Sequence, residues 1–300
     1  MRPARQPASW AASWPYARTI AFAFLLALAS GACSHAPGPG TAREAAPEAA
    51  PTPSDRAPAL GDAFARIDQA RRDGRPALAI FDIDGTVLDP AARTRDILAL
   101  ALEGPEAAIR PSRPDLAQAM RALPLARHGY EAESTLTRIG VTDTASVRAL
   151  KARWNRDFFT NQFLLRDEAL PGAVAYLDSL HARGATLVYF TGRDAPRMLS
   201  GTAQSLLLRG FPIGVVRTML VMKPDKSQPD FDYKKAALDE LAAFGTVVAV
   251  FENEPRNINL LHERFPRALA FYLDTKHSAN APAVEPGIAW IKDFAGFRSR

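Results

Sequence analysis

The chain has one cysteine, Cys33, among its 300 residues, which excludes an internal disulfide. It has no long apolar run, because the most hydrophobic stretch, residues 19–29, is too short for an ordinary membrane-spanning helix. Acidic residues are absent from residues 1–33, which hold three arginines. The formal net charge of +5 therefore falls to about +2 in the remainder, with 34 basic and 32 acidic residues. Nucleic-acid binding, which needs a dense basic face, is not predicted.

The first 33 residues are typical of a secretory signal. Basic residues precede the apolar run, and the small residues 30–32 lead directly to Cys33. This order resembles a bacterial lipoprotein signal in which Cys33 is lipidated; simple cleavage near Ala29 or Ala32, or an uncleaved anchor, are the alternatives. We expect an exported protein on the periplasmic face of the envelope, either an outer-membrane lipoprotein held by acylated Cys33 or a free periplasmic protein. Residues 34–60, rich in Ala and Pro, are predicted to form a tether.

Two carboxylates stand directly after a buried apolar run. Residues 77–81 read as a core strand, and Asp82 and Asp84 follow it with Gly85 next. Side chains at positions i and i+2 of an extended segment project from the same side, so both acids can reach one bound group. Clustered carboxylates repel one another and favour a cation, for which Mg²⁺ with its oxygen ligands is the best candidate. The alternative is an Asp-Gly turn that only ends a strand.

Alternating strand and helix patterns predict an α/β fold with a Rossmann-like parallel sheet. Apolar runs with strand character recur, and segments with helical periodicity separate them. The expected strands are 77–81, 185–190, 214–216 with 219–222, 246–251 and, at the sheet edge, 268–273; the expected helices are 62–72, 195–209 and 233–244. Residues 90–166 are predicted to form an inserted helical cap, which leaves 61–89 and 167–300 as the core. The aromatic residues near Trp154 read as cap core or as pocket.

Three more positions fall at expected strand ends or helix starts. Thr191 and Gly192 follow the second strand, where a hydroxyl and an amide could bind phosphate. Lys234 stands near a helix start, where a positive charge is unfavourable for the helix itself and suggests a bound anion. Glu252 ends the fourth strand, at the point where a metal would sit. Each also has a plain structural reading: a strand terminator, a solvated lysine, or an acid favoured in a first helical turn.

In this order, the motifs resemble the haloacid dehalogenase-like hydrolase superfamily, over residues 62–275, and most closely its secreted acid phosphatase branch. The resemblance implies a type-one cap, Asp82 as a nucleophile that forms an aspartyl-phosphate, and Asp84 as the acid and base. It implies that Thr191, Gly192 and Lys234 hold the phosphoryl group. It also implies a Mg²⁺ site made by Asp82, Glu252 and Asp84, the last through its backbone carbonyl.

The fourth motif departs from the usual pattern. Glu252 replaces the aspartate, Asn257 stands near the place of a second acid, and Glu254 is an alternative ligand. Lys223 and Lys235 remain alternatives to Lys234. The expected function is Mg²⁺-dependent hydrolysis of small phosphomonoesters in the cell envelope. A phosphotransferase of the same fold, or a non-catalytic envelope lipoprotein that uses the fold as a binding module, are the alternatives.

Overall fold

The computed structural model describes residues 21–22, 59–105 and 107–297. Apart from residues 21–22, the predicted signal segment with its Cys33 lipidation site lies outside this part of the chain, and so does the predicted tether up to residue 58. Nothing in the described part tests those two predictions. In the part that is described, no helix combines the length and the apolar character needed to cross a membrane.

The centre of the fold is a sheet with six parallel strands, in the order β6-β5-β2-β7-β8-β9. The two-residue strand β1 (Ala21–Phe22) adds an antiparallel edge beside β6. The parallel strands are β2 (Ala77–Phe81), β5 (Thr186–Asp194), β6 (Thr218–Lys223), β7 (Thr246–Glu252), β8 (Leu269–Leu273) and β9 (Ala289–Ile291). The predicted α/β class with a parallel sheet is confirmed.

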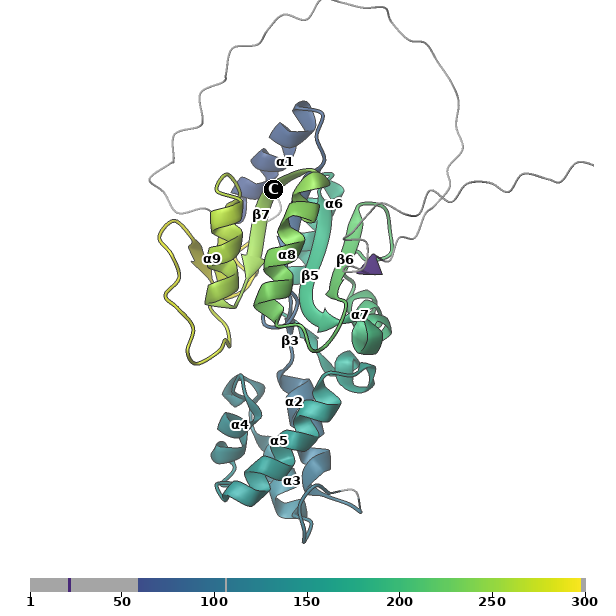
Figure 1. Ribbon diagram of the computed structural model, residues 1–300, viewed down its shortest axis with the longest axis vertical. Helices are drawn as coiled ribbons and strands as arrows, with labels where there is room; N and C mark the ends of the chain where they lie inside the picture. The colour runs from purple at the N-terminus through teal and green to yellow at the C-terminus, as the bar shows by residue number, and fades with distance from the viewer. Residues whose placement is uncertain (1–20, 23–58, 106, 298–300) are drawn as a thin grey trace, which may run out of the picture.

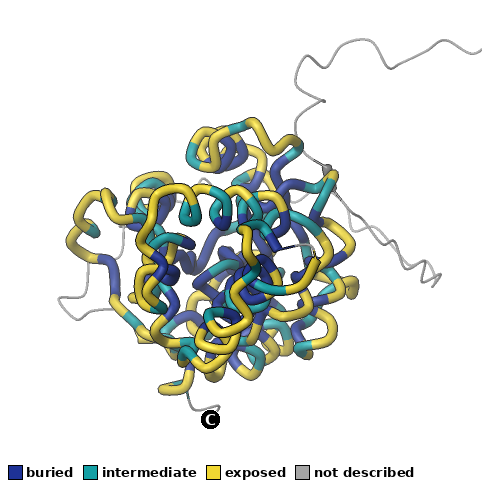
Figure 2. Tube along the Cα trace, turned by 90° about the horizontal axis from the view of Figure 1, so that it is seen from below, coloured by how far each residue is buried: buried dark blue, intermediate teal, exposed yellow. Residues whose placement is uncertain are grey.

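Helices cover both faces of this sheet because the strand side chains alternate between two apolar cores. Ala77, Ala79 and Phe81 pack in one core, whereas Leu78 and Ile80 pack in the other. Buried segments fill the interior and exposed ones surround them (Figure 2). The first core includes residues of α1 (Asp62–Arg72), α6 (Ala173–Ala182) and α7 (Ala195–Leu208); the second includes residues of α8 (Asp230–Ala243) and α9 (Pro255–Arg264).

A helical unit is inserted between β2 and β5, and it lies at one end of the molecule (Figure 1). It has an apolar core of its own, to which Leu98, Met120, Leu150 and Trp154 contribute. Its two connections to the sheet pair as a short antiparallel ribbon of β3 (Leu88–Asp89) and β4 (Glu168–Ala169). We call this unit the cap; its elements are α2 (Ala91–Leu102), α3 (Pro114–Ala122), η1 (Leu125–Arg127), α4 (Ala132–Arg138), α5 (Thr144–Phe158) and η2 (Asn161–Arg166).

Three details differ from the elements predicted by the sequence pattern. The strand expected at the sheet edge, β8, is flanked by β9, a strand too short to stand out by periodicity. The predicted strand at 214–216 is a turn in which Gly214 has a φ of 72°, so only Thr218–Lys223 extends the sheet. Helix α8 begins at Asp230, directly after Pro229, so Lys234 lies one turn inside it. The helix-start argument for Lys234 was therefore wrong, although its position near the sheet was not.

Candidate functional site

The candidate site lies where three neighbouring strands end at the same edge of the sheet. Strand β2 lies between β5 and β7, so Asp82, Thr191 and Glu252 come together at their carboxyl ends. The Asp82 amide donates to the Phe251 carbonyl at 3.0 Å, which carries the β2–β7 pairing up to the acid. Parallel strands place their carboxyl ends together, and this is where ligands bind in open α/β sheets.

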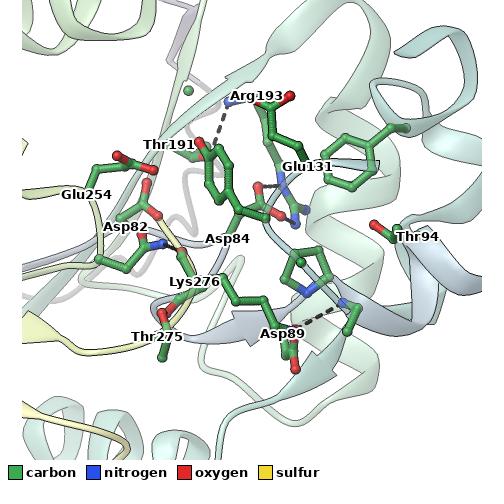
Figure 3. Close-up of a pocket in the computed structure, with 18 of the residues that line it drawn as sticks. Asp82, Asp84, Asp89, Thr94, Glu131, Thr191, Arg193, Glu254, Thr275 and Lys276 are labelled. Carbon is green, nitrogen blue, oxygen red and sulfur yellow. Dashed lines mark hydrogen bonds and ion pairs between the residues drawn. The ribbon is translucent and has the colours of Figure 1, made fainter. Parts of the chain in front are cut away.

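The turn after Asp82 depends on Gly85. Its φ of 81° lies in the left-handed region, which side chains larger than hydrogen rarely adopt. A Cβ at Gly85 would also lie 2.9 Å from Cγ of Asn253 and 3.3 Å from Oγ1 of Thr275. The Thr275 hydroxyl donates to the Gly85 carbonyl at 2.6 Å. The loop that carries Asp82 and Asp84 is thus fixed against Asn253, after β7, and Thr275, after β8; Figure 3 shows Asp82, Asp84 and Thr275 at this edge of the sheet.

Lys234 joins the two acids on the β2 and β7 ends. Its ammonium lies 2.7 Å from Asp82 Oδ1 and 2.5 Å from Glu252 Oε2, and all three side chains are buried. Burial alone disfavours the charged ammonium, but the two carboxylates outweigh it and raise the pKa of Lys234. Of the three lysines considered, Lys234 is the one at Asp82, because Lys223 pairs with Asp230 and Lys235 is exposed.

Asp82 has too little positive charge around it. Burial raises the pKa of Asp82 well above its usual range, and repulsion by Glu252 raises it further, although Lys234 opposes both effects. Two carboxylates share one ammonium in this cluster, so a net negative charge is buried when both are ionised. The second oxygen of Asp82 accepts a long hydrogen bond from the Thr86 hydroxyl, at 3.4 Å. An added cation would therefore lower the free energy of the cluster.

The residues present fit a magnesium ion at Asp82 and Glu252. Mg²⁺ is commonly held by one or two carboxylates and keeps several waters, and it prefers hard oxygen ligands. No group of three or more His, Cys, Asp or Glu side chains in the described residues is arranged to hold a metal by itself. Glu252 Oε1 accepts from the amides of Asn253 and Glu254 at 3.1 and 3.0 Å. The alternative ligand Glu254 is held by Ser278, at 2.8 Å from its hydroxyl.

Thr191 and Gly192 lie beside this cluster and line the same cavity. The Thr191 hydroxyl accepts from the Arg193 amide at 3.2 Å, which turns the chain at this point of β5. A Cβ at Gly192 would lie 2.5 Å from Oδ2 of Asp230, so glycine allows the start of α8 to approach. Phosphate binding by these two residues stays a prediction.

Asp84 is held by two arginines. Arg193 donates to both oxygens of its carboxylate at 2.7 Å, and Arg93 from the cap donates to Oδ1 (Figure 3 shows Asp84 and Arg193). Burial opposes ionisation, yet the two guanidinium groups outweigh it and hold the pKa of Asp84 far below its usual range. The Asp84 carboxylate is thus ionised and engaged by both arginines.

Sequence reasoning missed Arg93 and Asp167. Asp167 is fully buried between the arginines, 2.7 Å from Arg193 Nη2 and 2.9 Å from Arg93 Nε. Arg93 lies near the start of the predicted helical cap, and nothing in the local sequence distinguishes it from the neighbouring Arg95. The partners of Arg93 lie 9 and 74 positions away along the chain, a pairing that only the folded cap brings about.

A cavity of about 760 Å³ opens above Asp82, between the sheet edge and the cap. The cap contributes Tyr130, Glu131, Lys151 and Trp154 to its wall. Trp154 is both a pocket residue and part of the cap core, because it is only 8% exposed and packs against Phe158. The cap thus covers the site and forms the wall farthest from the sheet.

A family model described as a haloacid dehalogenase-like hydrolase matches residues 76–258, a range that includes the cap and every predicted site residue after Cys33. A search of curated proteins finds no significant match. The range covers well over half of the 300 residues.

Solved structures show similarity at low sequence identity. A class C acid phosphatase from Bacillus anthracis with tungstate bound is 12% identical, with a TM-score of 0.37, and the match covers 66% of this chain and 62% of that one. A haloacid dehalogenase-like family hydrolase from Streptococcus pneumoniae is 14% identical, with a TM-score of 0.42 and coverages of 72% and 94%. Protein Tyrosine Kinase A from Mycobacterium tuberculosis is 16% identical, with a TM-score of 0.43 and coverages of 72% and 93%. Proteins with such different names do not define an activity.

Proposed function

The chain belongs to the haloacid dehalogenase-like hydrolase family, and we propose that it is a Mg²⁺-dependent phosphomonoesterase that works through an aspartyl-phosphate. One observation carries this proposal. Asp82 ends the central strand, is ion-paired to Lys234 at 2.7 Å, and opens onto a cavity closed by the cap. A carboxylate nucleophile needs a nearby positive charge for the phosphoryl oxygens and a wall that limits access of water.

In the first step, a carboxylate oxygen of Asp82 attacks phosphorus, and the bond from phosphorus to the ester oxygen breaks. The alcohol leaves with its electron pair and takes up a proton. In the second step, water attacks the aspartyl-phosphate and loses a proton, which releases inorganic phosphate and restores Asp82. Lys234 and the hydroxyl and amide groups at Thr191 and Gly192 offset the negative charge on the transferred group.

Asp84 is the nearest candidate for moving the protons, since it lines the same cavity two residues from Asp82. Its two arginine partners favour the ionised form, which cannot donate a proton to the leaving alcohol. While both arginines hold it, the ionised Asp84 carboxylate can take a proton from the attacking water in the second step, and esters whose leaving groups need no proton are the better substrates.

Mg²⁺ held by Asp82 and Glu252 would supply positive charge to a phosphoryl oxygen and offset the excess negative charge of this cluster. Asn257 lines the cavity and is neutral, so it adds no charge to the donor set. Because Glu252 already accepts two backbone amides and Lys234, its orientation is set before any ion arrives.

We propose that the enzyme acts in the cell envelope, on the strength of the basic, apolar and small-residue order that ends in Cys33. The test is the intact mass of the protein recovered from the membrane fraction, compared with Cys33→Ser. A mass that exceeds the mass of the polypeptide by that of an attached lipid supports lipidation, provided that the excess is absent from Cys33→Ser. An unmodified protein in the periplasmic fraction supports simple export instead.

The activity is tested by phosphate release from a panel of aryl, alkyl and sugar phosphomonoesters, with added Mg²⁺ or with chelator. Asp82→Asn is the test variant, and Asp239→Asn is the matched control, because Asp239 is exposed on α8 and pairs only with surface Arg264. We expect turnover that is lost in Asp82→Asn and in chelator but kept in Asp239→Asn. Absence of turnover with every ester and metal would favour a binding module. Capture of phosphate by added alcohols would identify a phosphotransferase.

A further inference from the structure

Four charged side chains, three of them buried, form a closed ring at the junction of cap and core. Asp84 and Asp167 are the acids, Arg93 and Arg193 are the bases, and each acid contacts both bases. Three of these side chains are at most 2% exposed, whereas Asp84 is 30% exposed, and Asp84 and Arg193 line the cavity. Two positive and two negative charges leave the ring neutral.

The two arginines are anchored to different parts of the molecule. Arg193 belongs to strand β5, and its Nη1 also lies 3.2 Å from the hydroxyl of Thr202 on α7. Arg93 belongs to the first cap helix, and its Nη1 donates to the Phe158 carbonyl at 3.1 Å. Its guanidinium also lies 3.8 Å from the centre of the Phe158 ring. Of the two arginines that contact Asp84, one therefore belongs to the core and the other to the cap.

We infer that Arg93 is a positioning residue through which the cap sets the orientation of the Asp84 carboxylate. Arg93 contacts Phe158 at the end of α5 and also Asp167. A shift of the cap helices would therefore displace its guanidinium and remove one of the two arginine contacts of Asp84. The phosphate contacts proposed for Lys234 and Thr191 would be made by core elements, β5 and α8, and neither side chain is hydrogen-bonded to Arg93. The inference rests on the proposed hydrolase activity, because it assigns Arg93 an effect on the rate and none on phosphate binding.

The experiment compares kcat and KM of Arg93→Lys and Arg93→Ala with wild type, on an ester that the wild-type protein hydrolyses. Inorganic phosphate is titrated calorimetrically in parallel. We expect kcat to fall by about 100-fold in Arg93→Ala, since small misplacements of a reacting group have effects of that size. The Kd of inorganic phosphate should change less than about twofold. Lysine keeps the positive charge but lacks the planar set of donors of a guanidinium, so kcat of Arg93→Lys should lie between those of wild type and Arg93→Ala.

Guanidinium ion at a non-denaturing concentration provides a readout that a purely structural role would not move. It should restore part of kcat in Arg93→Ala, because it can occupy the vacated place between Asp84 and Asp167, whereas urea should not. Arg95→Ala is the matched control: Arg95 is on the same helix, pairs with its neighbour Asp96 at 2.8 Å and is 29% exposed. We expect near wild-type kcat there and no response to guanidinium.

The outcomes separate the inference from the proposed function. If wild type releases no phosphate, the proposed function fails. If wild type is active and Arg93→Ala keeps its kcat, or loses kcat and phosphate affinity together without rescue, the inference about Arg93 is wrong and the function stands. If Arg93→Ala does not fold, Arg93→Lys and Asp167→Asn give the same comparison, since each disturbs the ring without removing the Arg93 side-chain volume. Unchanged kcat in both would overturn the inference.

Discussion

Two buried charge clusters lie under one cavity, and they differ in how completely their charges are balanced. The Lys234 cluster holds two acids and one base and is built entirely from the core. The Arg93 ring holds two acids and two bases and joins the cap to the core. The first is incomplete and calls for another cation. The second is complete and holds parts of the chain together. The comparison suggests a chemical role for the unbalanced cluster and, as inferred above, a positioning role for the balanced one.

The largest effect should come from removing the one positive charge of the Lys234 cluster. Lys234→Met would leave Asp82 and Glu252 buried with no ammonium between them. We expect a loss of about 3–5 kcal/mol in the free energy of unfolding, and no phosphate release. Urea denaturation measures the first and the phosphate assay the second. Lys235→Met is the control, because that side chain is exposed on the same helix. Equal stability of the two variants would mean that the buried acids are neutralised in another way.

Adding the missing charge should stabilise the same cluster. Mg²⁺ is expected to raise the free energy of unfolding of wild type by about 2.7 kcal/mol at 100 times its Kd, and chelator should reverse this. Glu252→Gln should abolish most of the increase, whereas Glu263→Gln, near the end of α9, should keep it. Stabilisation of both variants to the same degree would place the metal elsewhere.

Gly85 lies next to Asp84 in the loop that joins the two clusters, so its replacement tests how tightly that loop is held. Gly85→Ala and Gly104→Ala both force alanine into a positive φ, at about 1–2 kcal/mol each. Only Gly85 also meets Asn253, whereas a Cβ at Gly104 has no neighbour within 4 Å. We expect Gly85→Ala to lose about 1–3 kcal/mol more than Gly104→Ala in thermal or urea unfolding. Equal losses would mean that the loop can move away from Asn253.

The smallest effect, taken per pH unit, is a difference in pH dependence in the absence of metal. The folded pKa of Asp82 is raised, so above its unfolded pKa of about 3.9 stability falls as pH rises towards the folded pKa, by at most about 1.4 kcal/mol per pH unit. The folded pKa of Asp84 is lowered, so its contribution is fully present above about pH 3.9 and is lost only below it. Between pH 4 and 7, wild type should gain stability relative to Asp82→Asn as pH falls. A constant difference would show that Asp82 is already balanced.

The core cluster could be predicted from the sequence, whereas the ring could not. Asp82, Thr191 and Glu252 each end a strongly apolar run, and parallel strands bring such ends to one edge. The helix-start argument for Lys234 is wrong, because α8 begins at Asp230. Its place in the order of the motifs along the chain was nevertheless informative. Arg93 and Asp167 meet only because the cap folds back on the core. Neither position has a strand end or a turn that would single it out.

The ribbon formed by Leu88–Asp89 and Glu168–Ala169 has a consequence for how such a molecule can diverge. Both ends of the inserted segment leave the core at one point, so the loop that it forms is closed by two paired strands, whatever its length. The cost of closing a longer loop grows only slowly with the number of residues. Helices can accordingly be added, lost or exchanged beyond this ribbon without moving the strands that carry Asp82, Thr191 and Glu252. New specificities can arise in a part of the chain that has an apolar core separate from the two cores on the faces of the sheet.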